Sequence, residues 1–93
     1  MKALLLYRPN SEHSTLVENY LRDFKMQTGK TIPTVDVDSP EGIETCRIHE
    51  IMEYPAILVT DDEGRQQNIW TGTQLPRFGE VSYYVKDTRT ERL

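Results

Sequence analysis

Hydrophobic residues along the chain follow first a strand pattern, then a helix pattern, then a strand pattern again. Ala3 to Tyr7 is an unbroken apolar run, which is typical of a strand covered on both faces. From Thr15 onward one helical stripe collects Leu16, Val17, Tyr20, Leu21 and Phe24. Apolar and polar residues alternate toward the end of 32–37, which predicts a half-buried second strand. Because the joins are short, we expect a βαβ unit with parallel strands.

Capping residues mark the ends of the two predicted helices. Ser11 and Thr15 can each cap the first helix, and we favour the earlier start at Ser11 and an end at Thr28-Gly29. Ser39-Pro40-Glu41 has the order of a cap, a first-turn proline and an acidic residue, and predicts a second helix that reaches His49 or Glu50. Gly42 lies inside this second helix and is expected to weaken it.

The last third of the chain predicts a hairpin followed by a helix. The apolar run Ala56–Thr60, an Asp-Asp-Glu-Gly turn and the short arm Gln67–Trp70 indicate two antiparallel strands. The segment Thr73–Pro76 repeats the cap-and-proline opening, and the helical spacing of Leu75, Phe78, Val81 and Val85 predicts a final amphipathic helix.

The length and net charge of the chain limit the number of domains and the kinds of partner that it can have. The 93 residues suit one domain, expected over 1–86, with a polar and flexible tail over 87–93. A net charge of −4 disfavours nucleic acid and anionic membranes as partners. No apolar stretch approaches a membrane span, and the apolar run near Met1 is too short for a signal sequence, so we expect a cytoplasmic monomer.

Three short segments and the order of the elements resemble one known family. The segment 54–64 is Tyr-Pro-Ala-Ile-Leu-Val-Thr-Asp-Asp-Glu-Gly. It resembles a segment of that family in which a proline opens the third strand and an acidic, glycine-containing turn follows the strand. Val35–Asp38 resembles that family's second strand, and Trp70–Gly72 resembles the glycine that ends its fourth. With the order β-α-β-α-β-β-α, these segments resemble the thioredoxin-like superfamily, which includes thioredoxin and glutaredoxin, from Lys2 to Val85. The resemblance implies a mixed four-stranded sheet flanked by three helices.

The resemblance also locates an altered active site. It implies a cis bond before Pro55, facing the start of the first helix, where the family carries Cys-x-x-Cys. Here those positions hold Ser11-Glu12-His13-Ser14. A serine hydroxyl stays protonated and its oxygen cannot form a mixed disulfide, so we expect no dithiol chemistry. Leu5 stands where the family keeps a buried aspartate for proton transfer, and Asn10 stands where it keeps a tryptophan.

The same surface is the candidate binding site. It is formed by the degenerate active-site positions Ser11, Glu12, His13, Ser14, Glu53, Tyr54 and Pro55. An extended peptide could pair with the main chain of Glu53 and Tyr54 as an added strand, or the amides at the helix start could take an anion. We assign no catalytic residue, cofactor or metal, and expect a protein or peptide partner.

Other polar residues have simpler interpretations than chemistry. Ser11 and Ser14 are expected to cap the helix, and His13 to be a solvated loop residue. Cys46, the only cysteine, excludes an internal disulfide and is expected to pack in the core. Cys46 and His49 are spaced for one helix face but lack the further ligands of a zinc site. The acidic run Asp61–Glu63 lacks the ligand pattern of a calcium loop and is interpreted as a turn.

Two enzymatic alternatives stay open. In one, the serines stand in place of the cysteines of a thiol-disulfide oxidoreductase. In the other, the hydroxyls of Tyr7 or Ser11 support a glutathione reaction, as the resemblance to the first domain of glutathione transferases would imply. The Glu/Gln-Ser pair and the helical second domain of those enzymes are missing here.

Overall fold

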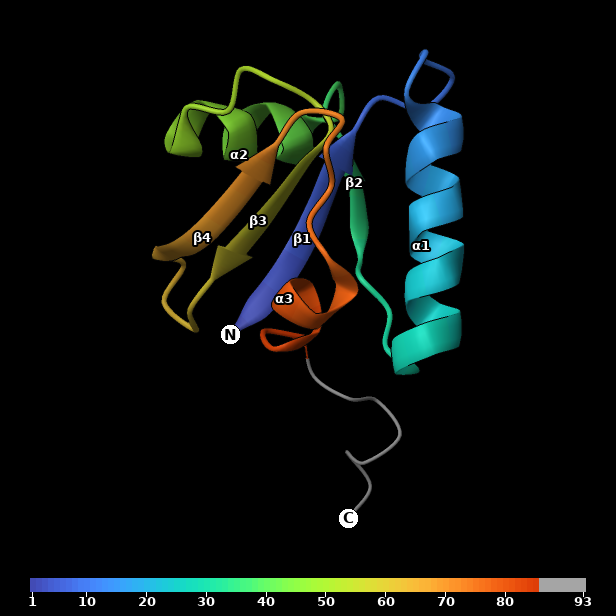
Figure 1. Cartoon of the computed structure of the whole chain (residues 1–93). Coiled ribbons are helices and arrows are strands. Elements are labelled where there is room, and N and C mark those ends of the chain that lie inside the picture. Colours follow the sequence, from blue (N-terminus) through green and yellow to red (C-terminus); the bar gives the residue numbers. More distant parts are fainter. Residues whose placement is uncertain (86–93) are drawn as a thin grey trace.

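The chain forms four strands and three helices in the predicted order (Figure 1). A computed structural model describes residues 1–85, and the expected tail at 87–93 lies outside the described residues. The elements are β1 (Lys2–Tyr7), α1 (Ser14–Thr28), β2 (Thr34–Asp36), α2 (Pro40–His49), β3 (Ala56–Thr60), β4 (Gln66–Thr71) and α3 (Phe78–Ser82).

The strands form one mixed sheet in the order β2-β1-β3-β4. β1 is parallel to β2 and antiparallel to β3, and β3 forms the expected hairpin with β4. Leu6 lies opposite Val35 on one side and opposite Ala56 on the other. The predicted fold class, a mixed four-stranded sheet flanked by three helices, is therefore confirmed.

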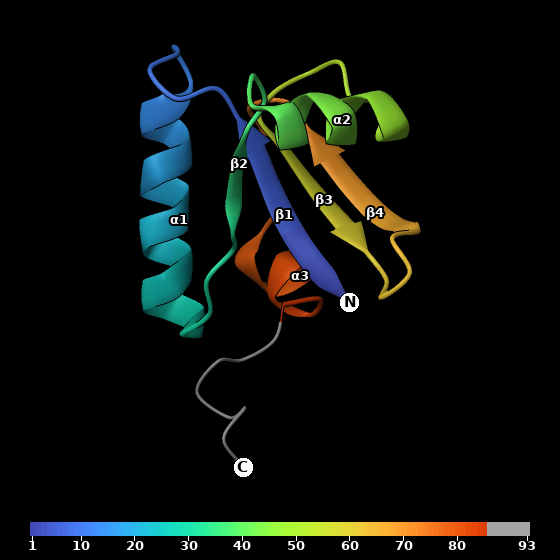
Figure 2. The same cartoon turned by 180° about the vertical axis from the view of Figure 1, so that it is seen from behind.

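The helices cover both faces of the sheet and create two hydrophobic cores. α3 lies in front of the sheet in Figure 1, and α2 lies in front of it in Figure 2. The core on the side of α1 and α3 contains Ala3, Leu5, Val17, Phe24, Ile32, Ile57, Val59 and Val81. The core under α2 contains Leu6, Val35, Val37, Cys46, Ile51, Ala56 and Leu58. Alternate residues of β1 thus enter opposite cores, which explains its unbroken apolar run.

Three element boundaries differ from the predictions. α1 begins at Ser14 and not at Ser11, because the chain turns at Asn10, whose φ of 64° is left-handed. α3 is confined to Phe78–Ser82, since the extended backbone of Arg77 precedes it and the Arg77 N–H donates to Glu80 Oε2 at 3.1 Å. β2 covers only the middle of 32–37.

α2 forms although Gly42 lies inside it, and Gly42 lets the helix pack closely on the end of β2. A Cβ at this position would lie 2.0 Å from the main-chain oxygen of Asp36. Only glycine lets the first turn of α2 approach the end of β2 this closely. None of the helices in the described part of the chain is long and apolar enough to cross a membrane.

Candidate functional site

Two segments meet where β1 ends, and they contain all the predicted site residues. The loop after β1 leads into α1, and Pro55 lies directly before β3, whose first residue pairs with Leu6. The peptide bond between Tyr54 and Pro55 is cis, the isomer that the resemblance implied. The Pro55 carbonyl accepts a hydrogen bond from the Gly72 N–H at 2.9 Å, which attaches this segment to the end of β4.

The two serines donate hydrogen bonds to main-chain carbonyls of their own loop. Ser11 Oγ donates to the Arg8 oxygen at 2.5 Å, and Ser14 Oγ donates to the Ser11 oxygen at 2.9 Å. The N-cap position of α1 is His13, and no side chain accepts from the amides of the first turn. The prediction that Ser11 and Ser14 cap this helix was wrong, because the turn at Asn10 brings carbonyls within reach of both hydroxyls.

His13 holds the loop in shape. Its ring is half-buried, and Nε2 accepts a hydrogen bond from the Arg8 N–H at 3.3 Å. The ring centroid lies 6.3 Å from that of Tyr7. His13 is thus not the freely solvated residue that the sequence suggested. Within residues 1–85 it makes no hydrogen bond to Ser11 or Ser14, so no serine-histidine pair is present.

Arg8 joins the two segments, and the sequence analysis did not identify it. Its guanidinium forms a two-point ion pair with Asp38, with Nε to Oδ2 at 2.8 Å and Nη2 to Oδ1 at 3.2 Å. The same guanidinium lies 5.7 Å from the centroid of the Tyr54 ring. The ion pair raises the pKa of Arg8 and lowers the pKa of Asp38. The sequence did contain a signal for this ion pair. Arg8 and Asp38 have opposite charges and follow two strands predicted to be parallel neighbours, and the ends of such strands share one edge of the sheet.

The side chains of Glu53 and Tyr54 are anchored. Glu53 Oε1 accepts from Thr71 Oγ1 at 3.4 Å, and a Cβ at Gly72 would lie 3.0 Å from Glu53 Oε2. Tyr54 is half-buried, and its hydroxyl makes a long hydrogen bond of 3.5 Å to the Ile51 oxygen. Burial, and then the hydrogen bond with the Cys46 thiol, raises the pKa of Tyr54. Cys46 itself is buried, so the predicted packing role is confirmed.

The main chain of this segment has unused hydrogen-bonding capacity. Within residues 1–85, the N–H and C=O groups of Glu53 and Tyr54 make no hydrogen bond. The preceding residue, Met52, is 87% exposed, which places an apolar side chain next to these free polar groups. A segment with fixed side chains and free main-chain groups is suited to pairing with another extended chain.

Comparison with solved structures identifies the fold. The chain is similar to the structure of thioredoxin 1 from the thermophilic eubacterium Thermosipho africanus TCF52B, with a TM-score of 0.58 and 13% sequence identity over 90% of this chain and 89% of that one. No family model matches the sequence, and no curated protein matches it. The chain therefore has a thioredoxin-like fold.

Proposed function

We propose that this thioredoxin-like domain binds an extended peptide and carries out no thiol-disulfide exchange. The observation that carries the proposal is the free main chain of Glu53 and Tyr54 beside the buried Pro55. An incoming strand would exchange hydrogen bonds with these groups, and such main-chain pairing supplies affinity while neighbouring side chains supply specificity. The exposed side chain of Met52 offers an apolar contact for the bound peptide.

The loop on the other side of the site supports the redox-inactive part of the proposal. Both hydroxyls of the Ser-Glu-His-Ser segment donate to loop carbonyls, so their protons are committed to holding the turn. The chain's one thiol is that of Cys46, which is buried against Tyr54 on the opposite face of the sheet from α1. With no sulfur at the helix start, the step that forms a mixed disulfide has no nucleophile.

The same geometry disfavours a glutathione reaction. A hydroxyl that stabilises a thiolate must donate its proton to sulfur, whereas Ser11 Oγ donates to the Arg8 oxygen at 2.5 Å. The Tyr7 side chain packs against the core on the α1 side. A titration with glutathione followed by NMR is expected to leave the amides of Tyr7, Ser11 and Ala56 unshifted.

A displayed library of random linear peptides, selected on the full chain, tests the binding function. The tightest peptide is then resynthesised with one backbone nitrogen methylated at a time. We expect affinity to fall about fivefold to tenfold at the position that donates to the Tyr54 carbonyl, since a lost hydrogen bond of this kind is worth about 1 to 1.5 kcal/mol. Methylation at the neighbouring positions, whose N–H groups point away, is expected to have little effect.

Two controls separate this site from the rest of the molecule. Met26→Ala, at an exposed position of α1, should bind the peptide unchanged, whereas Pro55→Ala should weaken it while NMR shows a folded domain. Amide shifts that cluster away from 52–55, or an N-methyl scan with no alternating pattern, would contradict the proposal. Reduction of insulin by dithiothreitol above the rate of Cys46→Ser would contradict the redox-inactive part.

A further inference from the structure

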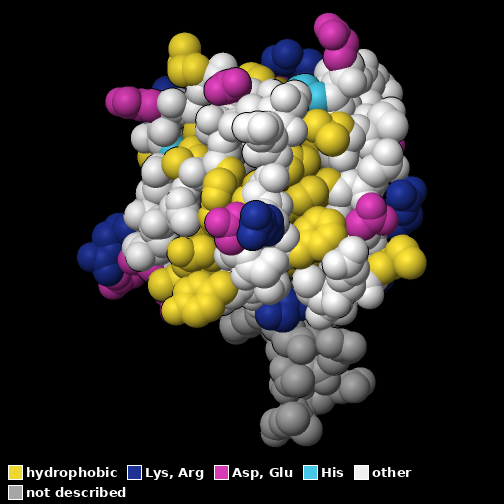
Figure 3. All heavy atoms as spheres, viewed as in Figure 1, with side chains coloured by type: hydrophobic (Ala, Val, Ile, Leu, Met, Phe, Trp, Pro, Cys, Tyr) yellow, Lys and Arg dark blue, Asp and Glu magenta, His cyan; other side chains and the backbone are white. Residues whose placement is uncertain are grey.

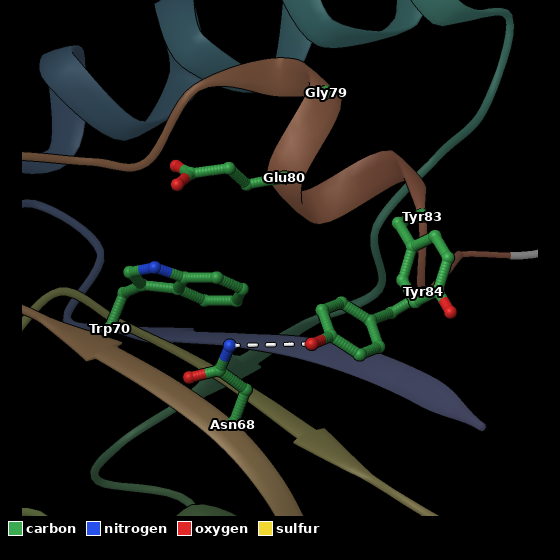
Figure 4. Close-up of a pocket in the computed structure, with 6 residues that line it drawn as sticks. All are labelled: Asn68, Trp70, Gly79, Glu80, Tyr83 and Tyr84. Carbon is green, nitrogen blue, oxygen red and sulfur yellow. Dashed lines mark hydrogen bonds between the residues drawn. The ribbon is translucent and has the colours of Figure 1, made fainter.

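A cavity lies between the edge strand β4 and α3, on a different part of the molecule from Pro55. Its volume is about 430 Å³, within the range of small-molecule sites. The lining residues are Asn68, Trp70, Gly79, Glu80, Tyr83 and Tyr84. Figure 4 shows the Trp70 ring on the floor of the cavity and the Glu80 carboxylate on the opposite wall. On this side of the molecule hydrophobic side chains reach the surface among charged ones (Figure 3).

Three aromatic rings form a concave wall of the cavity. The rings of Trp70 and Tyr84 have centroids 6.2 Å apart and planes inclined at 62°, and those of Tyr83 and Tyr84 are 5.1 Å apart at 85°. Rings at such steep angles present a face from one side and an edge from another. Gly79 adds no side chain, and an added Cβ there would meet nothing within 4 Å. The electron-rich ring faces attract a cation that enters the remaining space.

Some polar groups of the cavity are hydrogen-bonded to the protein, whereas the Trp70 indole N–H makes no hydrogen bond within residues 1–85. Asn68 Nδ2 donates to the Tyr84 hydroxyl at 3.4 Å, and Asn68 Oδ1 accepts from the Ile69 N–H at 2.8 Å. Glu80 Oε2 accepts from the Arg77 N–H at 3.1 Å, and within residues 1–85 Glu80 has no ion-pair partner. The cavity thus offers ring faces and one negative charge to a ligand.

We propose that this cavity binds a trimethylammonium group. Such a group carries a positive charge on an apolar surface and has no N–H donor, so it matches a wall of ring faces and an uncompensated carboxylate. A primary ammonium or guanidinium group holds its water more strongly through its N–H donors, so it would have to lose more hydration than a trimethylammonium group to reach the ring faces. The ligand source is either a small molecule that carries this group or a trimethylated lysine side chain.

Titration with choline chloride, followed by fluorescence, tests the proposal on the full chain. Trp70 is the only tryptophan, so its emission reports directly on this cavity. We expect a saturable change with choline and none with 3,3-dimethylbutan-1-ol, which has the same shape without the charge. A second titration with N-acetyl-trimethyllysine methylamide identifies the source, because the tighter of the two ligands indicates a small molecule or a modified protein side chain.

Two variants locate the binding. Glu80→Gln keeps an oxygen that can accept from the Arg77 N–H but removes the charge, and should weaken choline binding by about fivefold to tenfold. Ile48→Ala, at an exposed position of α2 on the opposite face of the sheet from α3, is the control and should bind choline with little change. Thermal unfolding of both variants checks that they fold. Equal responses to choline and to its neutral analogue, or an unchanged affinity in Glu80→Gln, would overturn the proposal.

Discussion

The helices α1 and α2 both begin at the same edge of the sheet, and a serine hydroxyl donates to a main-chain carbonyl at each, but only at α2 does a serine also cap the helix. At α2, Ser39 Oγ accepts a hydrogen bond from the Gly42 N–H at 3.0 Å, and Pro40 and Glu41 complete a well-formed start. At α1, Ser11 and Ser14 donate to loop carbonyls and leave the first amides of the helix without a side-chain cap. The comparison teaches that a serine before a helix is a cap only where the preceding turn leaves its oxygen facing the amides.

The largest effect should come from adding a side chain at Gly42, where α2 packs against the end of β2. Helix propensity alone predicts that Gly42→Ala is stabilising, by about 0.5 to 1 kcal/mol. Because the added Cβ would lie 2.0 Å from the Asp36 oxygen, we expect the opposite sign, a loss of at least about 2 kcal/mol in the free energy of unfolding. Denaturant titration measures this loss in the free energy of unfolding. Gly79→Ala, in α3 with open space around the Cβ, is the matched control and should be neutral or stabilising.

An effect of intermediate size on the free energy of unfolding should distinguish Ser39 from Ser11 and Ser14. Ser39→Ala removes a genuine cap and should lower the free energy of unfolding by about 1 kcal/mol. Ser11→Ala and Ser14→Ala should each cost less than about 0.5 kcal/mol, because neither change removes an acceptor for the helix amides. Three parallel urea titrations make the comparison. Equal losses at Ser39 and Ser14 would show that both serines stabilise their helices in the same way.

The smallest effect concerns the ion pair that connects the two helix starts. Arg8 holds the pKa of Asp38 below its usual value, so the pair contributes stability above the unfolded-state pKa of 3.8. This contribution should disappear as the pH falls through the lower, folded-state pKa. Both side chains are exposed, so the contribution is small and weakens with added salt.

Asp38→Asn provides the measurement for this pair. The wild-type chain should be slightly more stable than the variant at neutral pH and low salt, and the difference should shrink as the pH falls below the unfolded-state pKa of 3.8. A difference in stability that grows in acid would mean that the carboxylate is destabilising in the folded chain, contrary to the geometry.

Much of the fold could be predicted from the sequence because its signals are local. The apolar run of β1, the cap and proline before α2 and the acidic hairpin turn each depend on neighbouring residues, and each was confirmed. The role of Gly42 could not be predicted in this way, since its reason lies in the main chain of Asp36, on a different element. The start of α1 was wrong by one turn because the left-handed backbone of Asn10 has no strong sequence signal.

The role of 11–14 and 53–55 as a site stays a prediction, and the contacts around these segments could not be predicted from the sequence. The resemblance placed 11–14 and 53–55 together, and both segments lie where β1 ends. The connection through Arg8 required the parallel register of β1 and β2, which brings Arg8 and Asp38 to one edge. The aromatic cavity was missed altogether, since Trp70 and Tyr84 come from separate elements and only the packing of α3 on the edge strand brings them together.

The close approach of α2 to the end of β2 also limits which substitutions this part of the chain can accept. Variants that keep α2 packed on β2 can accept almost no side chain at position 42, whereas exposed positions nearby can accept other residues. Within the segment Ser-Pro-Glu-Gly at 39–42, the cap at Ser39 and the close approach at Gly42 should therefore tolerate the fewest substitutions.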